Sequence, residues 1–198
     1  MMRPVLTGRV ILGVSGASGA ALALQAAKVL RGAGIGIDLV LSPMAERTLA
    51  LEIGPKAHAE LIALAECLHP ITDLGATIAS GSCPVAGMIV APCSMRSLAA
   101  IAHGLDDNLL IRAAGVQLKE RRPLVLLARE APLTLAHLRN MTAVTEMGGI
   151  ILPPVPAFYL RPQTTHDITA QIAARAVDLL RLAPAQAHAW TPPNGENL

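Results

Sequence analysis

Aromatic side chains are almost absent from this 198-residue chain, which has one residue each of Phe, Tyr and Trp. Without a set of aromatics there is no stacking platform for the bases of a nucleic acid. The core has to be built from Ala, Leu, Ile and Val instead. The three aromatics, Phe158, Tyr159 and Trp190, each require an explanation of their own.

Charge is also scarce, at 15% of the residues, and 16 basic against 14 acidic side chains leave a net charge of +2. No run of Lys or Arg creates the field that nucleic-acid binding needs. The three cysteines, Cys67, Cys83 and Cys93, and the six histidines show no CxxC, HExxH or similar spacing. We therefore expect no metal site, and the small, odd number of cysteines is typical of reduced thiols in the cytoplasm.

Long hydrophobic runs are missing as well. No apolar stretch of about 20 residues runs free of Gly, Pro and charge, so we expect no membrane-spanning helix. The apolar run near the N-terminus is too short for a signal peptide. Yet 53% of the residues are hydrophobic. Part of this apolar surface is expected to be covered by further copies of the chain, because obligate interfaces resemble a core cut in half.

Apolar strands alternate with helices along the chain, which predicts an α/β domain with a parallel sheet covered on both faces. We expect a single domain over residues 1–182 and a tail over 183–198, whose Trp190 suggests docking on a neighbouring subunit. The predicted strands are 9–15, 35–41, 87–91, 123–128 and 149–152, and the predicted helices are 17–31, 43–53, 57–68, 95–103, 109–121, 133–147 and 165–182.

Polar groups gather where these strands end, and ligands of open α/β sheets bind at that edge. Gly16–Gly19 follows the first strand, and its backbone N–H groups could face an anion or only serve close packing. A dinucleotide site also needs an acidic residue at the end of the second strand. Asp38 lies inside that strand and Ser42 stands at its end, which favours a mononucleotide over NAD.

The segment after the third predicted strand, Ser94–Ser97, could hold a phosphate at a helix start, or Ser94 could be an ordinary N-cap. Cys93 is interpreted as a small apolar filler and not as a nucleophile, since no His motif stands beside it. Arg129 and Glu130 form a charge pair directly after a buried strand, where a guanidinium suits a phosphate or a flavin carbonyl.

Three further charged residues have a functional and a plain interpretation. Arg112 and Lys119 are seven residues apart, hence on one face of a predicted helix, which could be functional or simply solvated. Glu52 stands late in the second helix, where an exposed helix end is the simpler interpretation.

Several segments closely resemble the UbiX-like flavin prenyltransferases, and the resemblance runs from about residue 9 to residue 182. The stretches LKERRPLVL at 118–126 and PPVPAFY at 153–159 are the most specific. The same order of segments also includes GASG at 16–19, SGS at 80–82, PCS at 92–94, REAPL at 129–133 and HLRNM at 137–141.

The resemblance implies a Rossmann-like, flavodoxin-type domain that assembles as a dodecamer and needs no metal. It implies a transferase that joins dimethylallyl monophosphate to reduced FMN through bonds at flavin N5 and C6, with the diphosphate donor left open. The product, prenylated FMN, would serve a UbiD-type decarboxylase.

Carried over position by position, the resemblance also implies a set of site residues. Ser18, Glu52, Lys119 and Glu130 form the implied catalytic set, with the two glutamates in proton handling. Trp190 falls where the family has a tail aromatic near the active site. The implied flavin-binding residues are Gly16, Ala17, Ser18, Ser42, Ser94, Met95, Arg96, Ser97 and Arg129, and those around the prenyl phosphate are Arg112, Lys119, Tyr159 and Arg175.

The sequence departs from the family pattern at Pro43, where Lys is common, at Cys83, where an aromatic is common, at Gly115, where Asp is usual, and at Leu160, where His is usual. Two other functions remain open at this point. One is an FMN-dependent decarboxylase of the cysteine-decarboxylase type, and the other is a non-catalytic flavin carrier subunit. An NAD-dependent dehydrogenase is the least favoured.

Overall fold

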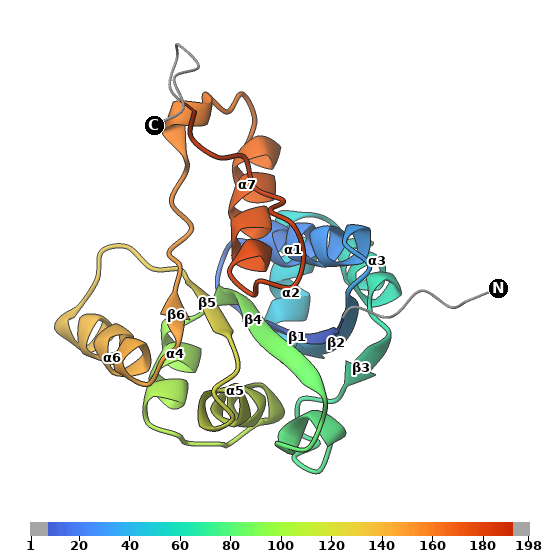
Figure 1. Ribbon diagram of the computed structural model, residues 1–198, viewed down its shortest axis with the longest axis vertical. Coiled ribbons are helices and arrows are strands. Elements are labelled where there is room, and N and C mark those ends of the chain that lie inside the picture. Colours follow the sequence, from blue (N-terminus) through green and yellow to red (C-terminus); the bar gives the residue numbers. More distant parts are fainter. Residues whose placement is uncertain (1–7, 192–198) are drawn as a thin grey trace.

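Parallel strands form one sheet at the centre of the computed structural model, which describes residues 8–191 (Figure 1). The strand order is β3-β2-β1-β4-β5-β6, the doubly wound Rossmann order, and without the short edge strand β3 it is the order of flavodoxin. The predicted fold class is thereby confirmed. The strands are β1 (Arg9–Val14), β2 (Gly36–Leu41), β3 (Cys67–His69), β4 (Val85–Cys93), β5 (Leu124–Ala128) and β6 (Ile150–Ile151).

Helices cover both faces of this sheet. One face packs against α1 (Ala20–Gly32), α2 (Pro43–Glu52), α3 (Ala57–Leu64) and α7 (Thr165–Asp178). The other packs against α4 (Met95–Ala102), α5 (Leu109–Lys119), α6 (Leu135–Glu146) and the 3-10 turn η1 (Thr77–Ala79). Both cores consist of aliphatic side chains and Ala, with Met88 and Cys93 on the second face, as the shortage of aromatics requires.

The largest difference from the expected elements is β3, which lies where the sequence predicts the end of a helix. The helix α3 stops at Leu64 because Ala65 is extended, with φ −88° and ψ 151°. The backbone N–H of Glu66 then donates to the Ile37 carbonyl, so the chain joins the sheet edge. Helix α1 begins at Ala20, later than predicted, because Gly19 is left-handed with φ 108°.

A long arm connects β6 to α7 and extends away from the sheet, and it includes the turn η2 (Phe158–Leu160) (Figure 1). Its side chains Val155, Phe158 and Tyr159 are 66%, 73% and 54% exposed. Apolar groups exposed to this degree on one projecting segment support the expectation that further copies of the chain cover it. Among residues 8–191, no helix has the length and apolar character needed to cross a bilayer.

The described part of the tail returns along α7 of the same chain, as Figure 1 shows. The backbone N–H groups of Gln186 and Ala187 donate to the Asp178 carboxylate over 2.7 and 3.1 Å. The backbone of His188 exchanges two hydrogen bonds with the Gln171 amide. These contacts fix the tail up to Trp190, which remains 58% exposed.

Candidate functional site

Ser15 ties together two strand ends at the point where the strand order reverses, between β1 and β4. Its hydroxyl donates to the Pro92 carbonyl and accepts from the backbone N–H of Ser94, both over 2.8 Å. Ser15 is 3% exposed. Ser15 is the last residue of the predicted strand 9–15 and is not among the predicted site residues, although a hydroxyl at the end of a buried strand is a signal that could have identified it. The first loop and the start of α4 are thereby held in fixed relation.

Glu52 occupies the start of α1. Its Oε2 accepts hydrogen bonds from the backbone N–H groups of Gly19 and Ala20, each over 2.8 Å. The Gly-rich loop was expected to face an anion there, and the anion in this chain is the carboxylate that ends α2. The close approach needs Gly16, because a Cβ at that position would lie 2.2 Å from the Cβ of Met44 on α2.

The surroundings of Glu52 change its pKa. Partial burial acts to raise the pKa, but the Ser18 hydroxyl, the two backbone N–H groups of Ala20 and Gly19 and the charge of Arg129 act in the opposite direction. The net result is a pKa below the ordinary value of 4.5, so Glu52 is ionised at neutral pH. Ser18, Glu52 and Arg129, predicted from separate segments, thus meet at the carboxyl edge of the sheet.

This depressed pKa predicts a pH-dependent contribution of Glu52 to stability. A carboxylate whose folded-state pKa is lowered stabilises the fold above its unfolded-state value of 4.5, and this contribution disappears as the pH falls through the folded-state pKa. We expect Glu52→Gln to lower the Tm by about 1–2 °C at pH 7 and by less near pH 3. Thermal denaturation of both proteins at the two pH values measures this, and an equal Tm difference at both would contradict it.

Two more helices start at the same edge, each with a serine cap. Ser42 Oγ accepts from the backbone N–H of Ala45 over 3.2 Å, and Ser94 Oγ accepts from that of Ser97 over 3.2 Å. Capping is therefore one role of both serines. Within residues 8–191 the backbone N–H groups of Met95 and Arg96 have no acceptor, so the start of α4 retains two donors for an anion.

Not every side chain near the start of α4 faces the carboxyl edge of the sheet. The guanidinium of Arg96 pairs with Asp107, so only the backbone of Arg96 belongs to the helix start. Cys93 is fully buried, which raises the pKa of its thiol to about 12 and agrees with its interpretation as an apolar filler. The backbone N–H of Arg129 donates to the Cys93 carbonyl over 3.1 Å, and exposed Glu130 follows, with Oε1 accepting from the N–H of Ala131.

Within one chain, Lys119 lies apart from Ser18, Glu52 and Arg129. It is the last residue of α5, which leads into the amino end of β5, and its ammonium pairs with Glu120. Next to it, the guanidinium of Arg122 donates to the carbonyls of Gly81 and Cys83, just before β4 begins. The predicted basic residue is therefore at the edge opposite to Glu52.

Arg112 lines the same groove as Lys119, which has a volume of about 830 Å³ and runs between the ends of α4, α5 and α6. Its guanidinium lies 3.8 Å from the carboxylate of Asp106. A Cβ at Gly115 would stand 3.3 Å from Oδ1 of Asp106, so this carboxylate adjoins the place of the aspartate usual in the family. The departure at Gly115 thus leaves Arg112 with an acidic partner.

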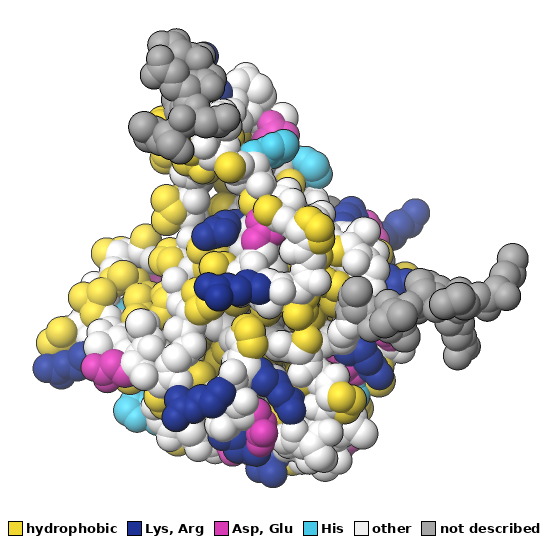
Figure 2. All heavy atoms as spheres, viewed as in Figure 1, with side chains coloured by type: hydrophobic (Ala, Val, Ile, Leu, Met, Phe, Trp, Pro, Cys, Tyr) yellow, Lys and Arg dark blue, Asp and Glu magenta, His cyan; other side chains and the backbone are white. Residues whose placement is uncertain are grey.

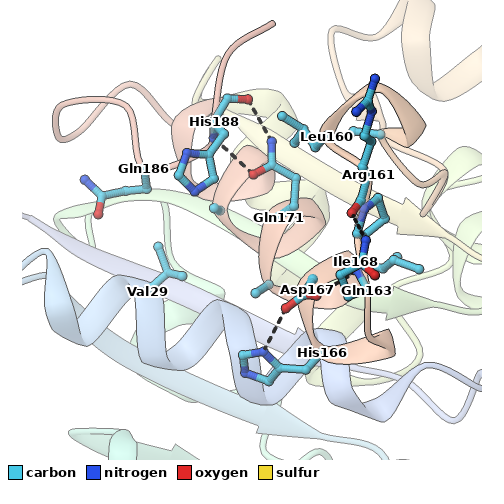
Figure 3. A pocket seen from close by; sticks show the side chains of 14 residues that line it. Val29, Leu160, Arg161, Gln163, His166, Asp167, Ile168, Gln171, Gln186 and His188 are labelled. Atoms are coloured by element: carbon cyan, nitrogen blue, oxygen red, sulfur yellow. Dashed lines mark hydrogen bonds and ion pairs between the residues drawn. The ribbon is translucent and has the colours of Figure 1, made fainter.

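Tyr159 and Arg175 both line a pocket of about 410 Å³ between the arm, α7 and the tail. Tail residues from Ala187 to Ala189 line it too, which places Trp190 beside it. A neighbouring pocket of about 430 Å³, shown in Figure 3, is closed on one side by the paired Gln171 and His188. That second pocket contains none of the predicted site residues.

Comparisons with known proteins show the family of this chain. The family model Flavoprotein matches residues 4–179. The curated flavin prenyltransferase UbiX of Neisseria meningitidis serogroup B is 52% identical over 182 residues, covering 92% of this chain and 96% of the relative. The UbiX of Thauera aromatica is 49% identical over 183 residues, covering 92% and 94%.

Solved structures show the same relationship. AnUbiX, in complex with FMN and dimethylallyl pyrophosphate, matches with a TM-score of 0.89 and 42% identity over 93% of this chain and 98% of its own. A dodecameric FMN-dependent UbiX-like decarboxylase from Escherichia coli O157:H7 matches with a TM-score of 0.88 and 43% identity over 93% and 100%. An FMN-dependent cysteine decarboxylase of thioviridamide biosynthesis, at 18% identity and a TM-score of 0.58, shares the fold alone.

Proposed function

The chain belongs to the UbiX family of flavin prenyltransferases, and on that basis we propose that it joins the prenyl group of dimethylallyl monophosphate to N5 and C6 of reduced FMN. It is a prenyltransferase that uses FMN as the acceptor and forms homo-oligomers. The observation that carries the assignment of the site is the meeting of Ser18, ionised Glu52 and Arg129 beside the free donors of α4.

The residues at the carboxyl edge fit a flavin mononucleotide. The backbone N–H groups of Met95 and Arg96, with the dipole of α4, suit its phosphate, whereas the donors at the start of α1 are already used by Glu52. Arg129 is available beside Glu52 for a ring carbonyl or the phosphate. When bound, reduced FMN supplies the nucleophile, so no activated Ser or Cys is required.

The charged groups then have distinct tasks. Breaking the allylic C–O bond leaves negative charge on the departing phosphate, and we assign its stabilisation to Arg175 and the Tyr159 hydroxyl, which share one pocket. Glu52 is ionised and can accept a proton from the acceptor nitrogen, while Glu130 is the second acidic group at this edge. Lys119 and Arg112 can contribute only from another copy of the chain, because they face the groove at the opposite edge.

Two incubations test the assigned reaction against the two alternatives. In the first, the protein is mixed anaerobically with reduced FMN and either dimethylallyl monophosphate or the diphosphate, and the flavin is analysed by mass spectrometry. A gain of one prenyl group in the flavin supports transfer, and the two arms identify the donor. In the second, the protein is mixed with oxidised FMN and a peptide that ends in cysteine, and oxidative decarboxylation of that peptide would favour the decarboxylase. Tight FMN binding without a product in either incubation would favour a carrier.

Arg175→Ala is expected to weaken the use of the prenyl donor without weakening FMN binding. Removing this guanidinium should raise the KM for the prenyl donor by about 10- to 100-fold, because one charged contact to a phosphate is lost. The Kd for FMN should stay within about twofold, since Arg175 lies in the pocket between the arm and α7. Steady-state kinetics and fluorescence titration measure both. Arg31→Ala, an exposed arginine in the last turn of α1 that lines none of the described pockets, is the matched control, and an equal loss of FMN binding in Arg175→Ala would refute the assignment.

Prenylated FMN would be passed to a UbiD-type decarboxylase, and we place both proteins in the cytoplasm. Family membership and the sparse, unpaired cysteines support these two points. The tail holds the exposed Trp190 beside the pocket of Tyr159 and Arg175 in its own chain, and its indole face is proposed to stabilise an allylic cation there.

A further inference from the structure

A polar cluster lies in the otherwise apolar edge of the sheet, formed by Arg9, Asp38, Cys67 and His69. Asp38 on β2 pairs in register with Cys67 on β3, and Val40 pairs with His69. Side chains two residues apart on a strand share a face, so Asp38, Cys67 and His69 project from the same side of the sheet. The group runs counter to the expectation of no metal site, which rested on ligand spacing, because Asp38 and His69 are 31 residues apart in the chain and form no motif.

The cluster brings together one oxygen, one sulfur and one nitrogen ligand. The three candidate atoms, from Asp38, Cys67 and His69, lie within 4.8 Å of one another. His69 Nε2 lies 2.8 Å from Oδ1 of Asp38, and the guanidinium of Arg9 contacts the same oxygen. Asp38 is only 2% exposed, and its Oδ2 has no hydrogen-bond partner within residues 8–191. A buried carboxylate oxygen without a partner is costly, which leaves Oδ2 open to a further ligand such as a cation.

We propose that Asp38, Cys67 and His69 bind a zinc ion that fastens the edge strand β3 to β2. Thiolate, imidazole and carboxylate are the ligand types of protein zinc sites, and water would take the fourth tetrahedral position. On binding, the Cys67 thiol releases its proton to solvent as the S–Zn bond forms. The two anionic ligands, Asp38 and the Cys67 thiolate, then balance the charge of the ion.

Arg9 has an alternative partner when the ion binds. Its Nε already lies 3.9 Å from Oε2 of Glu66, so the guanidinium can leave Asp38 and keep an ion pair. The zinc site is separate from the prenyl-transfer site, because Asp38 lies inside β2 and four residues before Ser42. The inference therefore goes beyond the proposed function and does not depend on it.

Zinc titration of the full chain, prepared without a histidine tag and stripped with a chelator, tests this proposal. Competition with a chromophoric chelator should reveal one equivalent of bound zinc per chain. Cobalt in place of zinc should give a thiolate-to-metal charge-transfer band and the intense visible bands of a tetrahedral site. Added zinc should also raise the Tm of the wild-type protein, because an ion that binds only the folded state stabilises it.

Two variants test whether the zinc binds at this cluster. Cys67→Ser should weaken zinc binding at least about tenfold and abolish the charge-transfer band, because the thiolate ligand is lost. Cys83→Ser removes another partly buried thiol and should bind zinc as the wild type does. The absence of a one-equivalent site in the wild type, or equal zinc binding by Cys67→Ser and the wild type, would overturn the proposal.

Discussion

Glu52→Gln is expected to lower the rate of prenyl transfer by about 10²- to 10⁴-fold, the range typical for loss of a general acid or base. The side chain keeps its shape, and its remaining oxygen can still accept from the start of α1. The variant loses the negative charge that the Ser18 hydroxyl, the two backbone N–H groups and Arg129 maintain at neutral pH. The proton released from the acceptor nitrogen then has no base at this position.

Single-turnover measurements with reduced FMN and saturating prenyl donor isolate this effect from substrate binding. The Kd of FMN should change by less than about threefold, since Glu52 is not assigned to the phosphate. Glu46→Gln is the matched control, because Glu46 lies on the same helix, in its first turn, and belongs to none of the predicted sites. A transfer rate within fivefold of the wild type in Glu52→Gln would refute the assigned role.

Ser18, Glu52 and Arg129 illustrate how much of the site can be predicted from sequence. Strand ends are readable from apolar runs, and parallel strands bring the loops at their carboxyl ends to one edge, so the neighbourhood of Ser18 and Arg129 is predictable. The position of Glu52 cannot be predicted in this way, because it depends on α2 folding back so that its last residue reaches the start of α1. That tertiary contact leaves no periodic signal, and only the family resemblance favoured Glu52 over a plain exposed helix end.

Ser15, Asp38 and Lys119 mark the limit of such predictions. The two hydrogen bonds of Ser15 connect positions 77 and 79 residues apart. The cluster around Asp38 depends on β3, whose residues Cys67–His69 are too few for a strand pattern to emerge. Helical spacing places Arg112 and Lys119 on one face, and the strand that follows the helix places Lys119 at the amino edge, but neither tells which other copy of the chain that face would meet.

Figure 2 shows Lys and Arg side chains, with a few acidic ones, interspersed with hydrophobic side chains on one face of the molecule. Arg121, Arg122 and Arg181 line a hollow of about 330 Å³ together with mostly apolar side chains. Arginine and large apolar side chains are enriched at protein interfaces, so this hollow and the exposed arm are two surfaces that suit contact with further copies of the chain.

A mixed assembly of two inactive variants is expected to recover about a quarter of the wild-type prenyl-transfer activity. The two variants are Glu52→Gln and Lys119→Ala, each expected to be nearly inactive alone. Glu52 lies at the carboxyl edge and Lys119 at the amino edge, so one chain cannot bring both to the same substrate. If each site takes Glu52 from one copy and Lys119 from another, random mixing leaves about one site in four with both residues intact.

The reciprocal mixture makes this result decisive. Wild-type chains mixed equally with the double variant Glu52→Gln/Lys119→Ala should also retain about a quarter of full activity when the site is shared between copies. If both residues acted within one chain, the first mixture would recover nothing and the second about half. Activity per chain, measured after dissociation and reassembly with each protein carrying a different affinity tag, distinguishes the two patterns. Zero in the first mixture together with half in the second would show that Lys119 reaches Glu52 within its own chain, against the geometry of α5.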